Sequence, residues 1–267
     1  MPSLRVLNHA FRAWRRNMTW SKHEPETPFL ADLLSGSPLC LHVGASDGRH
    51  TYVMTQVAPR AKIHAFEPSA FAFEVLKTCL SWHGIAGQVT PVHAAVSDQA
   101  GELLLVTPKK TSGRMGRAYA FLADSLPEGP VRPDLEDAGA VLQPTPVVTL
   151  DGYCREQGLD RVDFIRMNIE GAEQKALNGA LGVIERDRPH VLVEIHPVML
   201  ESRFQGSADG VVEFFLSRGY RMFALNGDLL EERSGIVPDL PWKDYFFIHP
   251  SRSARLPAGV FKARMAA

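Results

Sequence analysis

The sequence predicts an α/β protein built around a doubly wound, mostly parallel sheet that ends in an antiparallel strand. Short apolar runs alternate with longer amphipathic segments along most of the chain, which is typical of parallel strands joined by helices. The first apolar run, residues 39–43, leads straight into a turn bounded by Gly44 and Gly48. The next run, residues 63–66, ends at Glu67. A carboxylate at that strand end, beside a glycine turn, is the layout of a nucleoside-binding unit.

The expected elements follow from hydrophobic periodicity and from the positions of glycine and proline. In the first half of the chain we expect helices at 4–14, 29–34, 51–57 and 70–82, and strands at 39–43, 63–66, 89–96 and 101–107. In the second half we expect order to resume at 147–151, with a short helix to 157, strands at 162–167, 191–195, 220–225 and 245–248, and helices at 172–185 and 210–218. The gap between the third and fourth strands is too short for a helical crossover, so the fourth should pair antiparallel or lie at an edge. The count gives about seven core strands.

The length of 267 residues suits one large domain with extensions. We expect a helical extension at 1–36, a main domain at 37–250 and a tail at 251–267. Between 108 and 146 the apolar pattern gives way to Gly, Pro and charged residues, which predicts an irregular insertion able to close over a ligand. Its basic residues either recognise a carboxylate or phosphate on a substrate or are simply solvated: Lys109, Arg114 and Arg117.

The composition is that of an ordinary soluble protein, with 45% hydrophobic residues and a formal net charge of −1. This balance provides no field to gather nucleic acid, and no stretch approaches the roughly twenty apolar residues of a membrane span. The three cysteines lie among apolar neighbours, which is typical of reduced thiols, so we expect a cytoplasmic protein. The basic helix at 4–14 should pack on the domain or on a second subunit, which leaves a homo-oligomer possible; a weak interfacial anchor is the alternative.

The glycine spacing distinguishes between nucleoside cofactors. Dinucleotide sites use Gly-x-Gly-x-x-Gly so that the backbone can approach a pyrophosphate. This chain has Gly44-x-x-x-Gly48, with Asp47 beside the second glycine. A negative charge there would repel a pyrophosphate but suits the ammonium and sulfonium groups of S-adenosylmethionine (SAM). By itself the turn could be an ordinary strand-to-helix connection; Glu67, at the expected distance and able to accept hydrogen bonds from both ribose hydroxyls, favours the SAM site.

Several motifs in the second half resemble those of the FkbM family of SAM-dependent methyltransferases. The most specific is Ile-Glu-Gly-Ala-Glu at 169–173, and the likeness extends over about 39–249. The other matching blocks are Thr-Leu-Asp-Gly-Tyr at 149–153, Leu-x-Gly-Ala at 177–180 and Arg-Pro-His-Val-Leu-Val-Glu-Ile-His at 188–196. The resemblance implies a class I methyltransferase fold, Rossmann-like and seven-stranded, and methylation of a hydroxyl on a sugar, glycan or natural product.

The chain departs from the family pattern at three places. His42 stands in the first strand where the family carries an acidic residue, and Ser46 replaces an asparagine of the turn. The family's Lys-Ile-Asp-Val-Glu-Gly becomes Arg166-Met-Asn168-Ile-Glu-Gly. A role that needs a carboxylate at Asn168, such as binding a metal ion, is therefore in doubt.

The candidate site residues lie at the carboxyl ends of strands, where open α/β sheets bind ligands. A neutral alcohol must lose its proton during methyl transfer, so the site needs a positioned base. For catalysis we select Glu170, Glu194 and His196, with His196 as the general base unless the backbone satisfies it. For cofactor binding, partly by family analogy, we select Gly44, Ser46, Asp47, Gly48, Glu67, Pro68, Val96, Asp98 and Asn168. Glu173 is expected only to complement a helix dipole.

Three alternatives stay open from the sequence. A Mg²⁺ site made by oxygens of Asn168, Glu170 and Glu194 is conceivable but not favoured. The departures at His42 and Asn168 would also suit a catalytically silent SAM-binding module. An NAD-dependent oxidoreductase is disfavoured by the glycine spacing and Asp47. The expected partner is a small-molecule or glycan acceptor, whose identity the sequence does not encode in a readable way.

Overall fold

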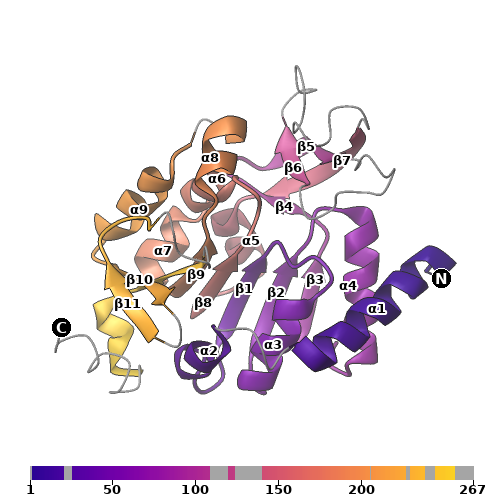
Figure 1. The fold of residues 1–267 in the computed structure, drawn as a ribbon, viewed down its shortest axis with the longest axis horizontal. Helices are drawn as coiled ribbons and strands as arrows, with labels where there is room; N and C mark the ends of the chain where they lie inside the picture. The colour runs from indigo at the N-terminus through magenta and orange to yellow at the C-terminus, as the bar shows by residue number, and fades with distance from the viewer. Residues whose placement is uncertain are drawn as a thin grey trace.

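The computed structural model describes residues 2–20, 26–108, 120–123, 140–204, 206–226, 229–237 and 244–255. Within these residues a large sheet has the strand order β11-β10-β12-β9-β8-β1-β2-β3, and a four-stranded sheet stands above it (Figure 1). The strands of the large sheet are β1 (Leu39–Val43), β2 (Lys62–Phe66), β3 (Val89–Val92), β8 (Phe164–Met167), β9 (His190–Glu194), β10 (Arg221–Asn226), β11 (Leu229–Arg233) and β12 (Asp244–Ile248).

The large sheet confirms the predicted doubly wound, mostly parallel architecture. Strand β1 pairs in parallel with β2 on one side and with β8 on the other, so the winding direction reverses beside β1. Strand β12 is antiparallel to both of its neighbours, β9 and β10, as expected for the final strand. The described sheet has one strand more than the seven expected, because β11 adds an antiparallel edge next to β10.

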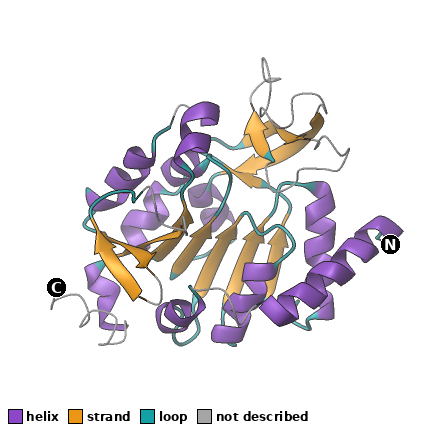
Figure 2. Cartoon of the chain, viewed as in Figure 1, coloured by secondary structure: helices purple, strands orange, loops and turns teal. Residues whose placement is uncertain are grey.

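Helices cover both faces of this sheet (Figure 2). They are α1 (Leu4–Trp20), α2 (Thr27–Leu33), α3 (Arg49–Val57), α4 (Ala70–Trp82), α5 (Leu150–Glu156), α6 (Glu173–Asn178), α7 (Leu181–Asp187), α8 (Pro197–Phe204) and α9 (Ala208–Leu216), followed by a 3-10 helix at Pro250–Arg255. Successive strand side chains point to opposite faces. Cys40 therefore packs into the core beneath α2 and α3, and Leu41 into the core beneath α5, α7 and α9.

Side-chain caps explain where several helices begin. Ser69 caps α4 by accepting a hydrogen bond from the N–H of Ala72, and α4 has the predicted bounds. The helix expected at 172–185 is two helices. The carboxylate of Asp151 accepts hydrogen bonds from the N–H groups of Gly182 and Val183, both at 2.8 Å, and so caps a new helix, α7.

The described parts of the segment 108–146, chiefly residues 120–123 and 140–146, are more regular than predicted. They contain β6 (Phe121–Ala123) and most of β7 (Ala140–Val148). Strand β7 pairs antiparallel with β5 (Gly101–Pro108) along the whole length of β5. For residues 140–146 the expectation was wrong, because the prolines Pro144 and Pro146 are typical of a loop. They occupy alternate positions of the strand, which lets both missing N–H groups fall on the side away from β5.

The strand expected at 89–96 is also divided. Strand β3 ends at Val92 in the large sheet, and β4 (Ala95–Val96) pairs with β7 in the small sheet. The small sheet has the strand order β4-β7-β5-β6. Its first strand, β4, begins directly after the end of β3. This junction places the small sheet over the carboxyl ends of the parallel strands.

Helix α1 packs on the domain, one of the two outcomes expected for it. Its buried residues Val6, Ala10 and Ala13 contact Val75 and Cys79 of α4. In Figure 1, α1 crosses α4 obliquely at the edge of the molecule. Among the described residues, no helix has the length and apolar character needed to cross a bilayer.

Candidate functional site

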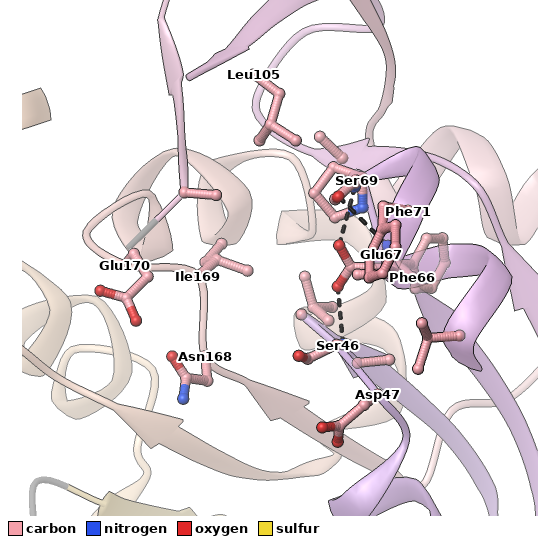
Figure 3. Close-up of a pocket in the computed structure, with 18 of the residues that line it drawn as sticks. Ser46, Asp47, Phe66, Glu67, Ser69, Phe71, Leu105, Asn168, Ile169 and Glu170 are labelled. Atoms are coloured by element: carbon pink, nitrogen blue, oxygen red, sulfur yellow. Dashed lines mark hydrogen bonds between the residues drawn. The ribbon is translucent and has the colours of Figure 1, made fainter. Parts of the chain in front are cut away.

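A cavity of about 500 Å³ lies at the carboxyl ends of β1, β2 and β8, where the winding of the sheet reverses. This is the position at which open α/β sheets bind ligands, and the volume suits a small molecule. The glycine turn after β1, the end of β2 with the start of α4, the turn after β8, and the small sheet all contribute to its wall (Figure 3). Helix α1 closes one side.

The turn after β1 needs its glycines for close approach and for backbone conformation. Gly44 has φ +85°, and a Cβ at this position would lie 1.9 Å from the carbonyl oxygen of Asn168. Gly48 has φ +84°, and its Cβ would lie 2.8 Å from Leu76. Gly44 lines the cavity, whereas Gly48 shapes the turn from behind. The glycine turn therefore packs closely against Asn168, just after β8, and this contact joins two sides of the cavity.

Glu67 points into the cavity from the end of β2, as predicted. One carboxylate oxygen accepts a hydrogen bond from the N–H of Ser46 at 2.8 Å, and the other accepts one from the N–H of Ser69 at 2.9 Å. Figure 3 shows both bonds and the carboxylate between them. Burial raises the pKa of Glu67 to about 7 and the charge of Asp47 adds to the rise, while the two N–H donors act in the opposite direction. The carboxylate is thus held in place with acceptor capacity left on each oxygen.

The turn after β8 forms the opposite wall. Asn168, Ile169 and Glu170 line the cavity across from Glu67 (Figure 3). Glu170 adopts the left-handed region with φ +57°, which is uncommon for a residue other than glycine and is often associated with functional sites. Glu173 is completely buried and accepts hydrogen bonds from the N–H groups of Ile169 and Gly171, at 3.1 and 3.3 Å. It therefore holds this turn in shape, a role beyond the dipole complement expected from the sequence.

Three predicted residues form a hydrogen-bonded chain behind this wall. The amide nitrogen of Asn168 donates to one oxygen of Glu194, and Nε2 of His196 lies 2.6 Å from the other. The hydrogen bond with Glu194 raises the pKa of His196 despite burial, and the charges of Glu170 and Glu173 act in the same direction. Glu194 and His196 do not line the cavity, so they reach it through Asn168.

The pKa of Glu194, the carboxyl group in this series of hydrogen bonds, shifts in the opposite direction. Burial raises the pKa of Glu194, but the hydrogen bond and charge of His196, with the charges of Arg166 and Arg49, outweigh it and leave the pKa below its usual value. The pair therefore favours a carboxylate hydrogen-bonded to an imidazolium. An imidazolium cannot accept a proton, which weakens the assignment of His196 as the general base.

The other predicted cofactor residues divide between cavity and surface. Ser46, Asp47, Pro68 and Val96 line the cavity. Asp98 is exposed and lies outside the lining, where its carboxylate accepts a hydrogen bond from the hydroxyl of Ser97 at 3.1 Å. The three basic candidates of the insertion lie outside the described residues: Lys109, Arg114 and Arg117.

Two parts of the wall were not predicted from the sequence. His9 and Arg16 of α1 line the cavity, and the guanidinium of Arg16 donates a hydrogen bond to the carboxylate of Asp47. Leu105 and Leu122 of the small sheet line the side above Glu67 and make it apolar. The sequence offered no local signal for either, because these residues meet the glycine turn only through the tertiary fold.

A buried polar cluster lies beside the cavity on the face covered by α2 and α3. Arg166 is 2% exposed; its guanidinium lies 3.1 Å from His50, 3.6 Å from Glu26 and 3.7 Å from Asp244. His42 is its register partner on β1. Burial lowers the pKa of His42 well below its usual value, and the charge of Arg166 acts in the same direction, so His42 is neutral. The acidic partners of the arginine are therefore supplied by Glu26 and Asp244 rather than by β1.

No metal centre is identified by the geometry. Within the described parts of the chain, no group of three or more His, Cys, Asp and Glu side chains is arranged to hold a metal ion. Of the conceivable Mg²⁺ ligands, Glu194 lies outside the cavity lining and faces Asn168 and His196 instead. The donor set therefore does not fit a metal site, and no chemical step is assigned to one.

Comparison with known proteins identifies similar sequences. A family model described as "Methyltransferase FkbM domain" matches residues 42–222. The chain is 29% identical to Methyltransferase sdnD of Sordaria araneosa over 55% of this chain and 61% of that protein. It is 25% identical to 31-O-demethyl-FK506 methyltransferase FkbM of Streptomyces tacrolimicus over 68% of this chain and 72% of that protein. It is 26% identical to 2-O-methyltransferase NoeI of Sinorhizobium fredii over 57% of this chain and 60% of that protein.

The similar solved structures include one that is also described as an FkbM methyltransferase. The methyltransferase FkbM from Methylobacillus flagellatus KT aligns with 79% of this chain and 43% of its own length, at 14% identity and a TM-score of 0.48. The present chain thus spans well under the full length of several proteins that it matches.

Proposed function

This chain belongs to the FkbM methyltransferase family, and on that premise we propose that it transfers the methyl group of SAM to a hydroxyl of a sugar, glycan or natural-product acceptor. The observation that carries the proposal is the position of Glu67, buried at the end of β2 and facing the cavity beside the glycine turn. Two relatives support an oxygen acceptor, since one is named a 2-O-methyltransferase and the other a methyltransferase of a 31-O-demethyl compound.

The residues present fit an adenosyl cofactor. The carboxylate of Glu67 can accept hydrogen bonds from both ribose hydroxyls while keeping those from Ser46 and Ser69. The apolar side chains of Val96, Leu105 and Leu122 suit the faces of an adenine. Gly44 lines the cavity and lets the turn pack against the backbone of Asn168, which a side chain at this position would strike. When bound, the cofactor supplies a methyl group activated by the sulfonium charge.

The acceptor side of the cavity is assigned to the turn after β8. Glu170 lines the cavity there, so its carboxylate is the group best placed to receive the proton of an acceptor hydroxyl. Asn168, held by Glu194, orients the acceptor or the cofactor with its remaining amide oxygen. His196 and Glu194 do not touch the acceptor. They act as positioning residues that hold Asn168 in place.

The silent-module alternative loses part of its support. His42 does not line the cavity, and the buried cluster around Arg166 supplies the missing acidic partners from Glu26 and Asp244. Asn168 does line the cavity, and its amide nitrogen donates a hydrogen bond to Glu194, whose pKa is lowered by His196 and nearby arginines. The departures from the family pattern are therefore compatible with an active site.

The test is methyl transfer by the purified protein. Incubation with SAM and a panel of sugars, glycans and polyketide alcohols, followed by mass spectrometry, should yield a product heavier by one methylene and demethylated cofactor. Glu170→Gln should abolish most product while keeping affinity for S-adenosylhomocysteine. Cofactor binding without transfer to any member of a broad panel would favour the silent module. Binding of NAD with no binding of S-adenosylhomocysteine would overturn the proposal.

A further inference from the structure

Arg16 and Asp47 bring opposite charges together in the cavity from two distant parts of the chain. Arg16 lies near the end of α1, and Asp47 lies in the glycine turn after β1. Both line the cavity, and the guanidinium donates a hydrogen bond to the carboxylate. The side chain of Arg16 is 43% exposed and that of Asp47 is 17% exposed, so the pair lies at the mouth of the cavity rather than in the core.

We propose that Arg16 and Asp47 form a clamp for the amino-acid end of the cofactor, in which Arg16 binds the α-carboxylate and Asp47 binds the α-ammonium. This inference rests on the proposed function. The amino-acid end of SAM is a zwitterion, and a cation beside a carboxylate is the arrangement complementary to it. A guanidinium can bind a carboxylate through two parallel hydrogen bonds, which gives direction as well as attraction.

The position of the pair fits this end of the ligand. Glu67 is assigned to the ribose, and the apolar wall of the small sheet is assigned to the adenine. Asp47 lies below Glu67, next to the glycine turn, on the side away from Leu105 (Figure 3). An extended ligand with its adenine toward Leu105 therefore places its amino-acid end toward Asp47 and Arg16.

Other nearby arginines are directed elsewhere. Arg49 also lines the cavity, but its guanidinium lies 3.2 Å from His50 and its charge acts on Glu194. Arg12 and Arg15 of α1 are exposed and do not line the cavity. Arg16 is thus the α1 cation that meets Asp47.

The packing of α1 fixes Arg16 in this place. Val6, Ala10 and Ala13 bury one face of α1 against α4, and the ring of His9 meets that of Phe71 edge-on at 5.6 Å. Helix α1 precedes the region matched by the family model, which begins at residue 42. The family domain alone would therefore lack one half of the clamp.

The test compares two ligands that differ only at this end. S-Adenosylhomocysteine carries the amino acid, whereas 5′-methylthioadenosine keeps the nucleoside and sulfur and lacks it. Titration calorimetry of the full chain should show that Arg16→Gln weakens S-adenosylhomocysteine by about tenfold to a hundredfold, the loss typical of a charged hydrogen bond. Binding of 5′-methylthioadenosine should stay within about twofold of wild type, because the clamp does not touch it.

Controls separate this outcome from a general effect. Arg12→Gln removes a cation from the exposed side of the same helix and should leave both affinities unchanged. Arg16→Lys, which keeps the charge, should recover part of the loss. A thermal midpoint of Arg16→Gln close to that of wild type shows that the variant is folded. If it is lower, the ratio of the two ligand affinities at a temperature where the variant is folded still decides.

Three results are decisive. Equal weakening of both ligands, or of neither, in Arg16→Gln overturns the clamp. Failure of the wild-type protein to bind either ligand overturns the proposed function itself. Selective loss of S-adenosylhomocysteine affinity supports both.

Discussion

The affinity of the cavity for an adenosyl ligand should depend on pH through Glu67. Burial raises the pKa of this carboxyl to about 7 in the free protein. Ribose hydroxyls donate hydrogen bonds to the ionised carboxylate, so the pKa in the complex is lower than in the free protein. Binding is therefore strongest above the free-protein pKa and weakens as the pH falls through it.

The magnitude follows from the fraction of ionised Glu67. With a pKa of about 7, the carboxyl is roughly nine-tenths ionised at about pH 8 and roughly one-tenth ionised at about pH 6. The dissociation constant of S-adenosylhomocysteine should therefore rise about tenfold between these values, a change of about 1.4 kcal/mol. Calorimetric titrations in a series of buffers measure this directly.

Glu67→Gln provides the control for that series. The amide does not ionise, so its dissociation constant should be higher than that of wild type at about pH 8 and should lack the tenfold dependence. Glu67 is not among the groups that shift the pKa of His196, so the variant should leave that shift unchanged. A wild-type affinity that is the same at both pH values, or a variant with the wild-type slope, would refute the assignment of Glu67 to the ribose.

The same pKa has a consequence for folding. Moving the pKa of Glu67 from its ordinary 4.5 to about 7 means that the folded protein holds a proton which the unfolded chain releases between those values. Burial of the charge thus costs stability as the pH rises through this window, by about 3 kcal/mol at most. Glu67→Gln should gain stability relative to wild type between about pH 5 and about pH 8, measured by urea unfolding. A constant difference across the window would contradict a buried, pKa-shifted carboxyl.

The remaining predictions concern the turn, the acceptor side and the positioning pair. Gly44→Ala would place a Cβ 1.9 Å from the carbonyl oxygen of Asn168 and should destabilise the fold by about 3 kcal/mol or more, whereas Gly36→Ala, with a similar φ of +83° and open space, should cost only about 1 kcal/mol; equal losses in urea unfolding would contradict the close approach. Glu170→Gln should lower kcat at least about a hundredfold with the affinity for S-adenosylhomocysteine unchanged, and a wild-type kcat would remove Glu170 from proton transfer. His196→Ala removes the hydrogen bond that lowers the pKa of Glu194, so the acid limb of the kcat profile should move to higher pH; an unmoved limb would show that this pair does not position the site.

The features that were predicted from the sequence are local ones. Residues 39–43 are followed at once by the glycine turn, and residues 62–66 end at Glu67, so periodicity and spacing placed both on the same sheet edge. The alternation of strands and helices along the chain likewise predicted the doubly wound sheet. Each of these signals lies within about ten residues along the chain, where backbone propensity and side-chain alternation act.

The features that were missed depend on contacts between distant segments. Arg16 meets Asp47 across 31 positions of the sequence, and no property of α1 alone indicates that it borders a cavity. Strand β7 was not predicted because it contains Pro144 and Pro146. Their alternate spacing lets β7 pair with β5 without the two missing N–H groups. His42 stands where the family has an acidic residue, and its neighbour Arg166 explains this departure. An acidic partner of Arg166, Glu26, comes from the N-terminal segment.

We propose that the cavity beside β1 holds an adenosyl ligand whose ribose binds Glu67. A crystal structure of the full chain with S-adenosylhomocysteine tests it most directly. We expect both ribose hydroxyls within hydrogen-bond distance of the Glu67 carboxylate, the adenine against Val96, and the amino-acid end toward Asp47. Density for the ligand in any other place, or a ribose turned away from Glu67, would contradict it.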